Sequence, residues 1–283
     1  MPTDNQHDIM ERIKKELDNS ALVFPTCFDL SLKIQKLIDD PESSVFDVAN
    51  TIQTEPVITS KLYQVANSVA LNPAGVPVRS VARIVQRTGL DLVRYLSMIV
   101  IREQVVHDMR SMELKSLASS LWRHTVDVMS WSYAIAEDTN IVRPDEIMFS
   151  CVMSTIGEFY ILHKAQQYPD LIENKESLCE IIDMYGTEIA NSILSSYGIS
   201  KNVSKVRDPK LFDHAFWPIK TVQDIVHFAN VLTDFENPFR DTTPNLDEYC
   251  ARFQVGDEVR DEIQEFIGNI QDIRDLLFTA VTM

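Results

Sequence analysis

Residues 148–162 read MFSCVMSTIGEFYIL, and this stretch indicates the class of fold. It is mostly apolar, as a buried helix is, although Ser154-Thr155 and Gly157-Glu158 interrupt it. Apolar residues recur at three- and four-residue spacing through most of the 283-residue chain, and strand-like alternation is scarce. The sequence therefore predicts an all-α protein, which we expect to form two packed helical subdomains.

The composition is that of a globular protein with an acidic surface. Apolar residues make up 45% of the chain, and the formal net charge is −16. Nucleic acids and anionic membranes attract positive surfaces, so we expect neither as a main partner. Twelve acidic and four basic residues lie between Asp234 and the C-terminus. They form either a solvated helical surface or an acidic docking face.

Cysteine usage and the first residues of the chain predict a cytoplasmic location. The cysteines are widely spaced and form no CxxC pair, so we expect free thiols and no metal knuckle: Cys27, Cys151, Cys179 and Cys250. The first eighteen residues are polar and charged, unlike a signal peptide. The longest apolar runs are far shorter than the roughly 20 residues that span a bilayer.

Helix signals place a series of elements along the chain. In the first half we expect helices at 7–19, from Pro25 to Asp40, at 56–71, 79–89 and 90–106, and a loop at 72–77. Ser44 followed by Asp47 predicts a capped helix start. In the second half we expect helices at 114–139, 143–168, 176–186, 187–198 and 221–235, and two more near the C-terminus. Gly186 and Gly198 are the expected C-caps of two of them.

Sequence motifs for catalysis are absent. The chain contains no GxGxxG, GxxxxGK[ST], GxSxG or HExxH. No two of its six histidines lie three or four residues apart, so no helix presents a paired-histidine metal edge. We therefore expect no enzyme activity, no metal and no cofactor.

Two patterns resemble a known family. The first is EPVITSKLYQVANS, residues 55–68, followed later by a Thr-Gly pair at 88–89 and a Leu-rich helix. The second is LWRHTVDV at 121–128, followed by CVMSTIGEF at 151–159 and HFANVL at 227–232. Together they resemble the HDOD family, the HD-related output domains of bacterial signalling proteins, over about residues 20–235. The positions that match the family motif are Glu55, Pro56, Lys61, Leu62, Ala66, Asn67, Ser68 and Gly89.

The resemblance also locates the place of a metal site. HD phosphohydrolases bind divalent metals with a His, a His-Asp pair on the next helix and a later Asp. The first His falls on His124, the His-Asp pair on Ser154-Thr155 and the late Asp on Asn230, while a further His of the family falls near Gly186. Divalent cations need anionic oxygen or imidazole ligands to offset their dehydration, and hydroxyls and an amide are poor replacements. The resemblance therefore implies a catalytically degenerate HD relative.

Each candidate site residue has a structural alternative. His124 is either a relict ligand that binds a small anion or a histidine packed between helices. Ser154 and Thr155 either line a polar pocket with Asn230 or hydrogen bond back to their own helix. Glu158 is either an acid–base group or an ion-paired carboxylate.

Two further features lie in the first half. Arg79, Arg83 and Arg87 have i, i+4, i+8 spacing, and the helical ridge that this predicts either binds a phosphate or an acidic helix or is simply solvated. Asn67-Ser68 is expected to be a buried polar bridge or a helix terminator.

These observations predict residues 1–110 as the N-terminal bundle of HDOD and residues 111–283 as a degenerate HD-like bundle with an acidic C-terminal extension. The resemblance implies a non-enzymatic bacterial signalling module that binds a protein partner. One alternative is a sensor that binds a nucleotide or another small molecule near His124, Ser154, Thr155 and Asn230. The other alternative is a metal-dependent phosphohydrolase with an unconventional site.

Overall fold

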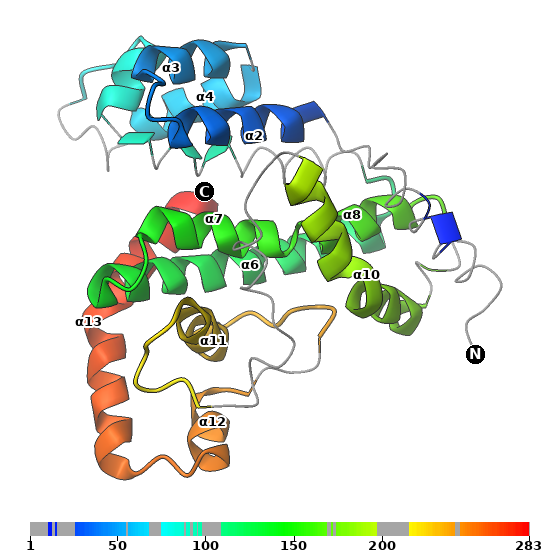
Figure 1. Ribbon diagram of the computed structural model, residues 1–283, viewed down its shortest axis with the longest axis vertical. Helices are drawn as coiled ribbons and strands as arrows, with labels where there is room; N and C mark the ends of the chain where they lie inside the picture. Colours follow the sequence, from blue (N-terminus) through cyan, green and yellow to red (C-terminus); the bar gives the residue numbers. More distant parts are fainter. Residues whose placement is uncertain are drawn as a thin grey trace. The chain divides into compact units, whose positions relative to one another are not determined.

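The structure is a computed structural model, and it divides into two compact units, Val23–Asp108 and Met1–Leu22 with Met109–Met283. It describes residues 11–12, 15, 26–54, 56–67, 75–87, 89–90, 93–94, 96–97, 109–168, 171, 174–196, 215–240 and 244–282. Within these residues the secondary structure is helical without strands, which confirms the predicted all-α class (Figure 1). The predicted division into residues 1–110 and 111–283, with an apolar boundary between them, stays a prediction.

The unit Val23–Asp108 contains three helices with defined bounds: α2 (Thr26–Asp39), α3 (Val45–Gln53) and α4 (Pro56–Ala66). Ser44 and Asp47 form a capping box at the start of α3, as predicted. Ile34, Ile52 and Leu62 are fully buried, so each helix contributes an apolar face to the core of this unit. The helix expected at 7–19 lies outside the described residues except for Glu11, Arg12 and Lys15, and that expected at 90–106 lies mostly outside them.

The other unit is organised around its longest helix. α6 (Met112–Thr139) packs against α7 (Pro144–Ser154), α11 (Val222–Leu232) and α13 (Asp257–Thr282). α8 (Ile156–Ala165) packs against α10 (Lys175–Ser196). Figure 1 shows α13, coloured orange to red, leading from the short helix α12 (Leu246–Arg252) to its packing with α6. Sixteen residues of α6 are buried, as expected of a helix that has neighbours on several sides.

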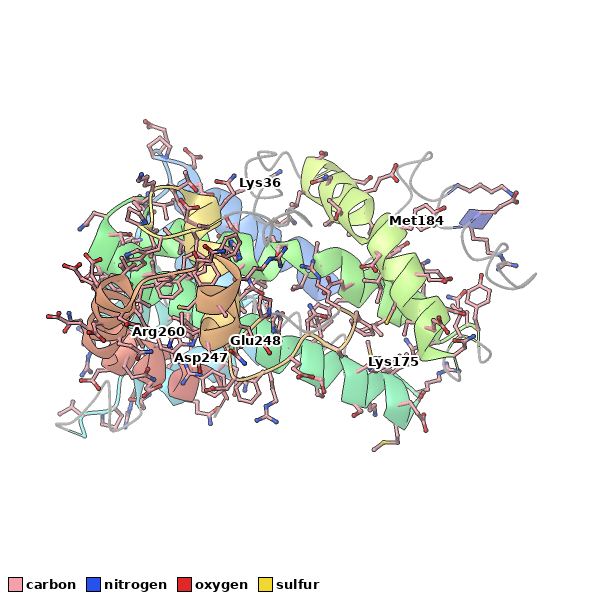
Figure 2. All side chains as sticks on the ribbon, turned by 90° about the horizontal axis from the view of Figure 1, so that it is seen from below. Lys36, Lys175, Met184, Asp247, Glu248 and Arg260 are labelled. Atoms are coloured by element: carbon pink, nitrogen blue, oxygen red, sulfur yellow. The ribbon has the colours of Figure 1, made fainter. Side chains whose placement is uncertain are left out.

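Capping boxes also begin helices in this unit. Thr221 and Asp224 cap α11, and Asn245 and Glu248 cap α12. In both cases the side chain of the first residue accepts the backbone N–H of the second, whose carboxylate accepts the backbone N–H of the first. α12 and α13 are further linked by an exposed ion pair of 3.2 Å between Asp247 and Arg260, both labelled in Figure 2.

Two helix predictions were wrong. The single helix expected at 143–168 is divided into α7 and α8 at Thr155, where the backbone has φ −96° and ψ 0°. The helices expected at 176–186 and 187–198 form one continuous α10 that includes Gly186. Gly198 lies outside the described residues.

Near the α7–α8 junction, α8 crosses closely over α10. A Cβ atom added at Gly157 would lie 1.9 Å from the carbonyl oxygen of Gly186. Gly157 therefore brings α8 close to the backbone of α10, and Gly186 is a helix-interior residue at this contact and no C-cap. None of the described helices is long and apolar enough to cross a membrane.

Candidate functional site

His124 is fixed between α6 and the segment that follows α11. Its side chain is buried, and Nδ1 lies 2.7 Å from the carbonyl oxygen of Phe235. Because a carbonyl only accepts hydrogen bonds, Nδ1 carries the proton and donates to it. Burial lowers the pKa of His124 below 6.5, and the Phe235 hydrogen bond and the Glu158 carboxylate oppose this shift only in part. His124 is therefore a neutral, positioned histidine.

Ser154 and Thr155 lie at the junction of α7 and α8 and bond to their own helix. The hydroxyl of Ser154 donates to the carbonyl of Cys151 at 2.7 Å, and that of Thr155 donates to the carbonyl of Val152 at 3.0 Å. Thr125, next to His124 on α6, donates to the hydroxyl of Thr155 at 3.4 Å and to the carbonyl of Leu121 at 2.8 Å. The structure thus joins the His124 region of α6 to Thr155.

Glu158 faces a cation. Its side chain has no exposed surface, and its carboxylate lies 3.6 Å from the guanidinium of Arg240, in the segment that follows α11. A buried carboxylate is costly without a positive or donating neighbour, so Arg240 stabilises the charge of Glu158. Arg240 lies 82 residues further along the chain, and no pattern in the sequence predicted that it pairs with Glu158.

Asn230 bonds to its own helix. Its amide donates to the carbonyl of Val226, one turn earlier on α11, at 2.7 Å. No interaction between Asn230 and His124, Ser154 or Thr155 is found in the described part of the chain. Of the predicted set, the structure therefore brings His124, Thr155 and Glu158 into one region.

A second polar cluster was missed entirely. Asp127 lies one turn after His124 on α6 and is fully buried. Arg274 of α13 donates to its Oδ1 through Nε at 2.8 Å and also through Nη2. Thr233 and the backbone N–H of Asp234 donate to Oδ2 at 2.8 and 3.1 Å. The sequence signal was a charged residue inside the otherwise apolar run VDVMSW, because a buried charge requires a partner.

The motif positions of the first half have mainly structural surroundings. Pro56 begins α4, Leu62 and Ala66 are buried, and Lys61 is half-buried. Gly89 has φ +80°, a left-handed conformation that favours glycine. Glu55 and Ser68 lie outside the described residues.

Asn67 is the most informative of the motif positions, and it is exposed instead of buried. It follows the last residue of α4, and both its backbone N–H and its side-chain amide donate to the carbonyl of Tyr63. Its Oδ1 accepts the backbone N–H of Val78 at 2.8 Å. Asn67 therefore bridges the end of α4 and Val78 at an exposed position, whereas one of the two predicted alternatives was a buried bridge.

The three arginines line one hollow, although they do not all belong to one helix. Arg83 and Arg87 lie on the helical stretch 81–87, and Arg79 precedes it. The hollow has a volume of about 650 Å³ and is lined by Val76, Pro77, Val78, Arg79, Ser80, Arg83, Gln86 and Arg87. The predicted i, i+4, i+8 helical ridge is therefore a combined surface of a helix and the segment before it.

The residues at the position of the HD metal site do not fit a divalent cation. At the position of the His-Asp pair, Ser154 and Thr155 supply only neutral hydroxyls, whereas a divalent cation needs anionic oxygen or imidazole ligands. The carboxylate in this region faces the positive charge of Arg240, which opposes a second cation. Among the described residues, no group of three or more His, Cys, Asp or Glu side chains is arranged to hold a metal ion.

Comparison with known proteins supports the fold and the family. A solved structure from Shewanella amazonensis SB2B, described as a putative metal-dependent phosphohydrolase, has a TM-score of 0.65 and 19% identity over 99% of this chain and 100% of its own. A protein from Geobacter sulfurreducens, described as an HDOD domain protein with unknown function, has a TM-score of 0.58 and 17% identity over 95% of this chain and 99% of its own.

A putative signal transduction protein from Marinobacter aquaeolei VT8 has a TM-score of 0.62 and 14% identity, over 99% of this chain and 65% of its own. At these identities the likeness shows the fold alone. No curated protein matches the sequence. The family model of the HDOD domain matches residues 24–206, well over half of the chain. The chain belongs to the HDOD family.

Proposed function

We propose that this HDOD protein is a non-enzymatic module of bacterial signal transduction that acts by binding a protein partner. The observation that carries the proposal is the chemistry at the α7–α8 junction. Where HD enzymes have a His-Asp pair, this chain has Ser154 and Thr155, whose hydroxyls donate to Cys151 and Val152 of their own helix. Neutral hydroxyls supply neither the negative charge nor the imidazole that a catalytic divalent metal needs.

Arg240 supports the same proposal. A guanidinium 3.6 Å from the Glu158 carboxylate supplies inside the protein the positive charge that a metal would otherwise supply. On this proposal the region is a structural junction of α6, α7 and α8, and the partner binds elsewhere, on the surface of the protein. One structural neighbour is named a putative signal transduction protein, which agrees with a regulatory role, and we propose that this role is in the cytoplasm.

The test is identification and reconstitution of a partner. The full chain is cross-linked in its native host, a captured protein is purified separately, and its binding to the full chain is measured by calorimetry. We expect one saturable complex between the purified proteins. Failure of every purified candidate to bind, together with phosphohydrolase activity of the chain, would refute the proposal.

A thermal-shift screen separates the sensor alternative from this proposal. A ligand at 100 times its Kd stabilises a protein by about 2.7 kcal/mol, which is several degrees for a chain of this size. We expect nucleotides and cyclic dinucleotides to give no such shift. A shift that His124→Asn abolishes would favour the sensor instead.

A further inference from the structure

The sequence between 56 and 90 has a charge opposite to that of the protein. It contains four basic residues, Lys61, Arg79, Arg83 and Arg87, and no acidic residue, in a chain of net charge −16. Over the whole unit Val23–Asp108, nine acidic residues balance eight basic ones. The negative charge of the protein therefore comes almost entirely from the other unit, and 56–90 is a local positive region.

Three of these four basic residues converge on the hollow of about 650 Å³. Arg79, Arg83 and Arg87 are exposed, and no acidic side chain among the described residues lies within ion-pair distance of Arg79 or Arg83. Val76, which is 67% exposed, and Pro77 add an apolar part to the same hollow. The surface thus combines guanidinium groups with an exposed apolar edge.

Hydrogen bonds from α4 fix one wall of the hollow, residues 76–80, which we call the strap. Asn67 accepts the backbone N–H of Val78 at 2.8 Å, and its amide donates to the carbonyl of Val78 at 3.4 Å. The hydroxyl of Tyr63 donates to the carbonyl of Arg79 at 3.0 Å. The carbonyl of Ser80 then accepts the N–H of Ile84 as helix 81–87 begins. The strap is therefore held in place before any partner binds, which reduces the entropy cost of binding.

We propose that the strap and helix 81–87 form a docking surface for an acidic linear segment of a partner protein. The proposal rests on the proposed function, since it names the chemistry of the partner. Arg79 and Arg83 both line the hollow and face no acidic side chain of the described residues, so they are placed to bind carboxylates spaced along a peptide. Arginine binds carboxylates through two parallel hydrogen bonds, and an apolar peptide side chain would cover Val76 and Pro77.

The surface fits a peptide better than the other anionic partners. Small-molecule pockets bury most of the ligand, whereas the arginines and most of the strap are exposed. Nucleic acid needs an extended positive surface, whereas the positive region of this chain is confined to residues 56–90. At physiological salt, charges act over only about 8 Å, so the negative charge elsewhere on the protein does little to repel a short acidic segment bound at the hollow.

The test compares two charge-reversal variants of the full chain. Arg79→Glu with Arg83→Glu alters the docking surface, and Lys33→Glu with Lys36→Glu on α2 changes the net charge equally at exposed residues that do not line the hollow. The probe is a fluorescent peptide rich in Glu and Leu, and its Gln-for-Glu counterpart is the uncharged control. Binding is measured by fluorescence anisotropy at low and physiological salt.

We expect the acidic peptide to bind the native chain and the lysine control alike. We also expect affinity about tenfold lower or more in the arginine variant and in the uncharged peptide. Asn67→Ala should weaken binding without any change in charge, because it releases Val78. Circular dichroism and thermal unfolding check that each variant folds.

Several results would overturn the proposal: no binding of the acidic peptide, equal loss in both charge-reversal variants, or tighter binding of a DNA duplex, inorganic phosphate or a second copy of the chain. The partner reconstituted under the proposed function separates the two claims. If it binds the native chain and the arginine variant equally, the docking surface is wrong and the proposed function stands.

Discussion

The contact between Arg274 and Asp127 gives the sharpest prediction about stability. Asp127 is fully buried on α6, and the guanidinium of Arg274, itself only 9% exposed, joins α13 to it. Arg274→Met keeps much of the apolar stem of the side chain and removes the guanidinium, which also lies over the rings of Trp131 and Phe278. Loss of one partner of a buried ion pair costs about 3–5 kcal/mol.

We expect the lower end of this range. Thr233 and the N–H of Asp234 still donate to Asp127 in the variant, so these two hydrogen bonds continue to offset part of the cost of burying its carboxylate. A loss of about 3 kcal/mol corresponds to a Tm lower by about 6–12 °C for a unit of this size. The free energy of unfolding is measured by urea denaturation, followed by circular dichroism.

Two further variants show whether the buried charge is the cause. Asp127→Asn in the Arg274→Met background removes the uncompensated charge, and it should restore most of the lost stability. Arg260→Met is the matched control on the same helix. It removes an exposed ion pair with Asp247, worth at most about 1 kcal/mol (Figure 2).

The cost of Arg274→Met should also depend on pH. Burial raises the pKa of Asp127 above 3.8 in the native protein, and its hydrogen bonds and Arg274 oppose this shift. The unfolded chain ionises first as pH rises, so a buried aspartate without its cation destabilises the fold most at neutral pH. The difference between variant and native protein should shrink as pH falls toward 3.8. A loss of unfolding free energy in Arg274→Met no larger than that in Arg260→Met, or no recovery of it when Asp127→Asn is added, would refute the reasoning.

Three other substitutions test the remaining structural interpretations. Burial lowers the pKa of His124 below 6.5, so the native protein should lose stability as pH falls through 6.5. His124→Asn keeps a donor for the carbonyl of Phe235 and should lose less stability between about pH 8 and pH 5. An equal change of the urea unfolding free energy with pH in both proteins would contradict a neutral buried histidine. Gly157→Ala should destabilise the protein by about 3 kcal/mol or more, because its Cβ would meet the backbone of Gly186. Gly268→Ala is the control on α13: it has open space around it and should stabilise the protein by about 0.5–1 kcal/mol. Similar Tm values for the two variants would argue against the close helix crossing. Ser44→Ala should cost about 1 kcal/mol through loss of the α3 cap, and an unchanged urea midpoint would show that the cap does not contribute.

Local signals in the sequence predicted local structure well. Ser44 and Asp47 formed the expected capping box, and Pro56 begins α4 as expected. Both signals act within one helical turn, so they need no knowledge of the rest of the chain.

Features that depend on distant residues were not predictable in this way. Gly186 is the residue type that helix C-caps favour, but it lies inside α10 at the close contact with Gly157 of α8. Asp127 and Arg274 lie 147 residues apart, and only the folded chain brings them together. Arg240 likewise reaches Glu158 from a loop. The predicted site residues on α6, α7 and α8 came from the family motif, because no local pattern in the sequence relates His124 to Thr155.

The most direct test of the central claim is metal retention by the purified full chain. The protein is incubated with Fe²⁺ or Mn²⁺, dialysed, and examined by elemental analysis and for hydrolysis of a chromogenic phosphodiester, with His124→Ala as the control. We predict no stoichiometric metal and the same background hydrolysis in both proteins, because Ser154 and Thr155 offer only backbone-bonded hydroxyls. One equivalent of tightly held metal, with hydrolysis that His124→Ala abolishes, would contradict the account.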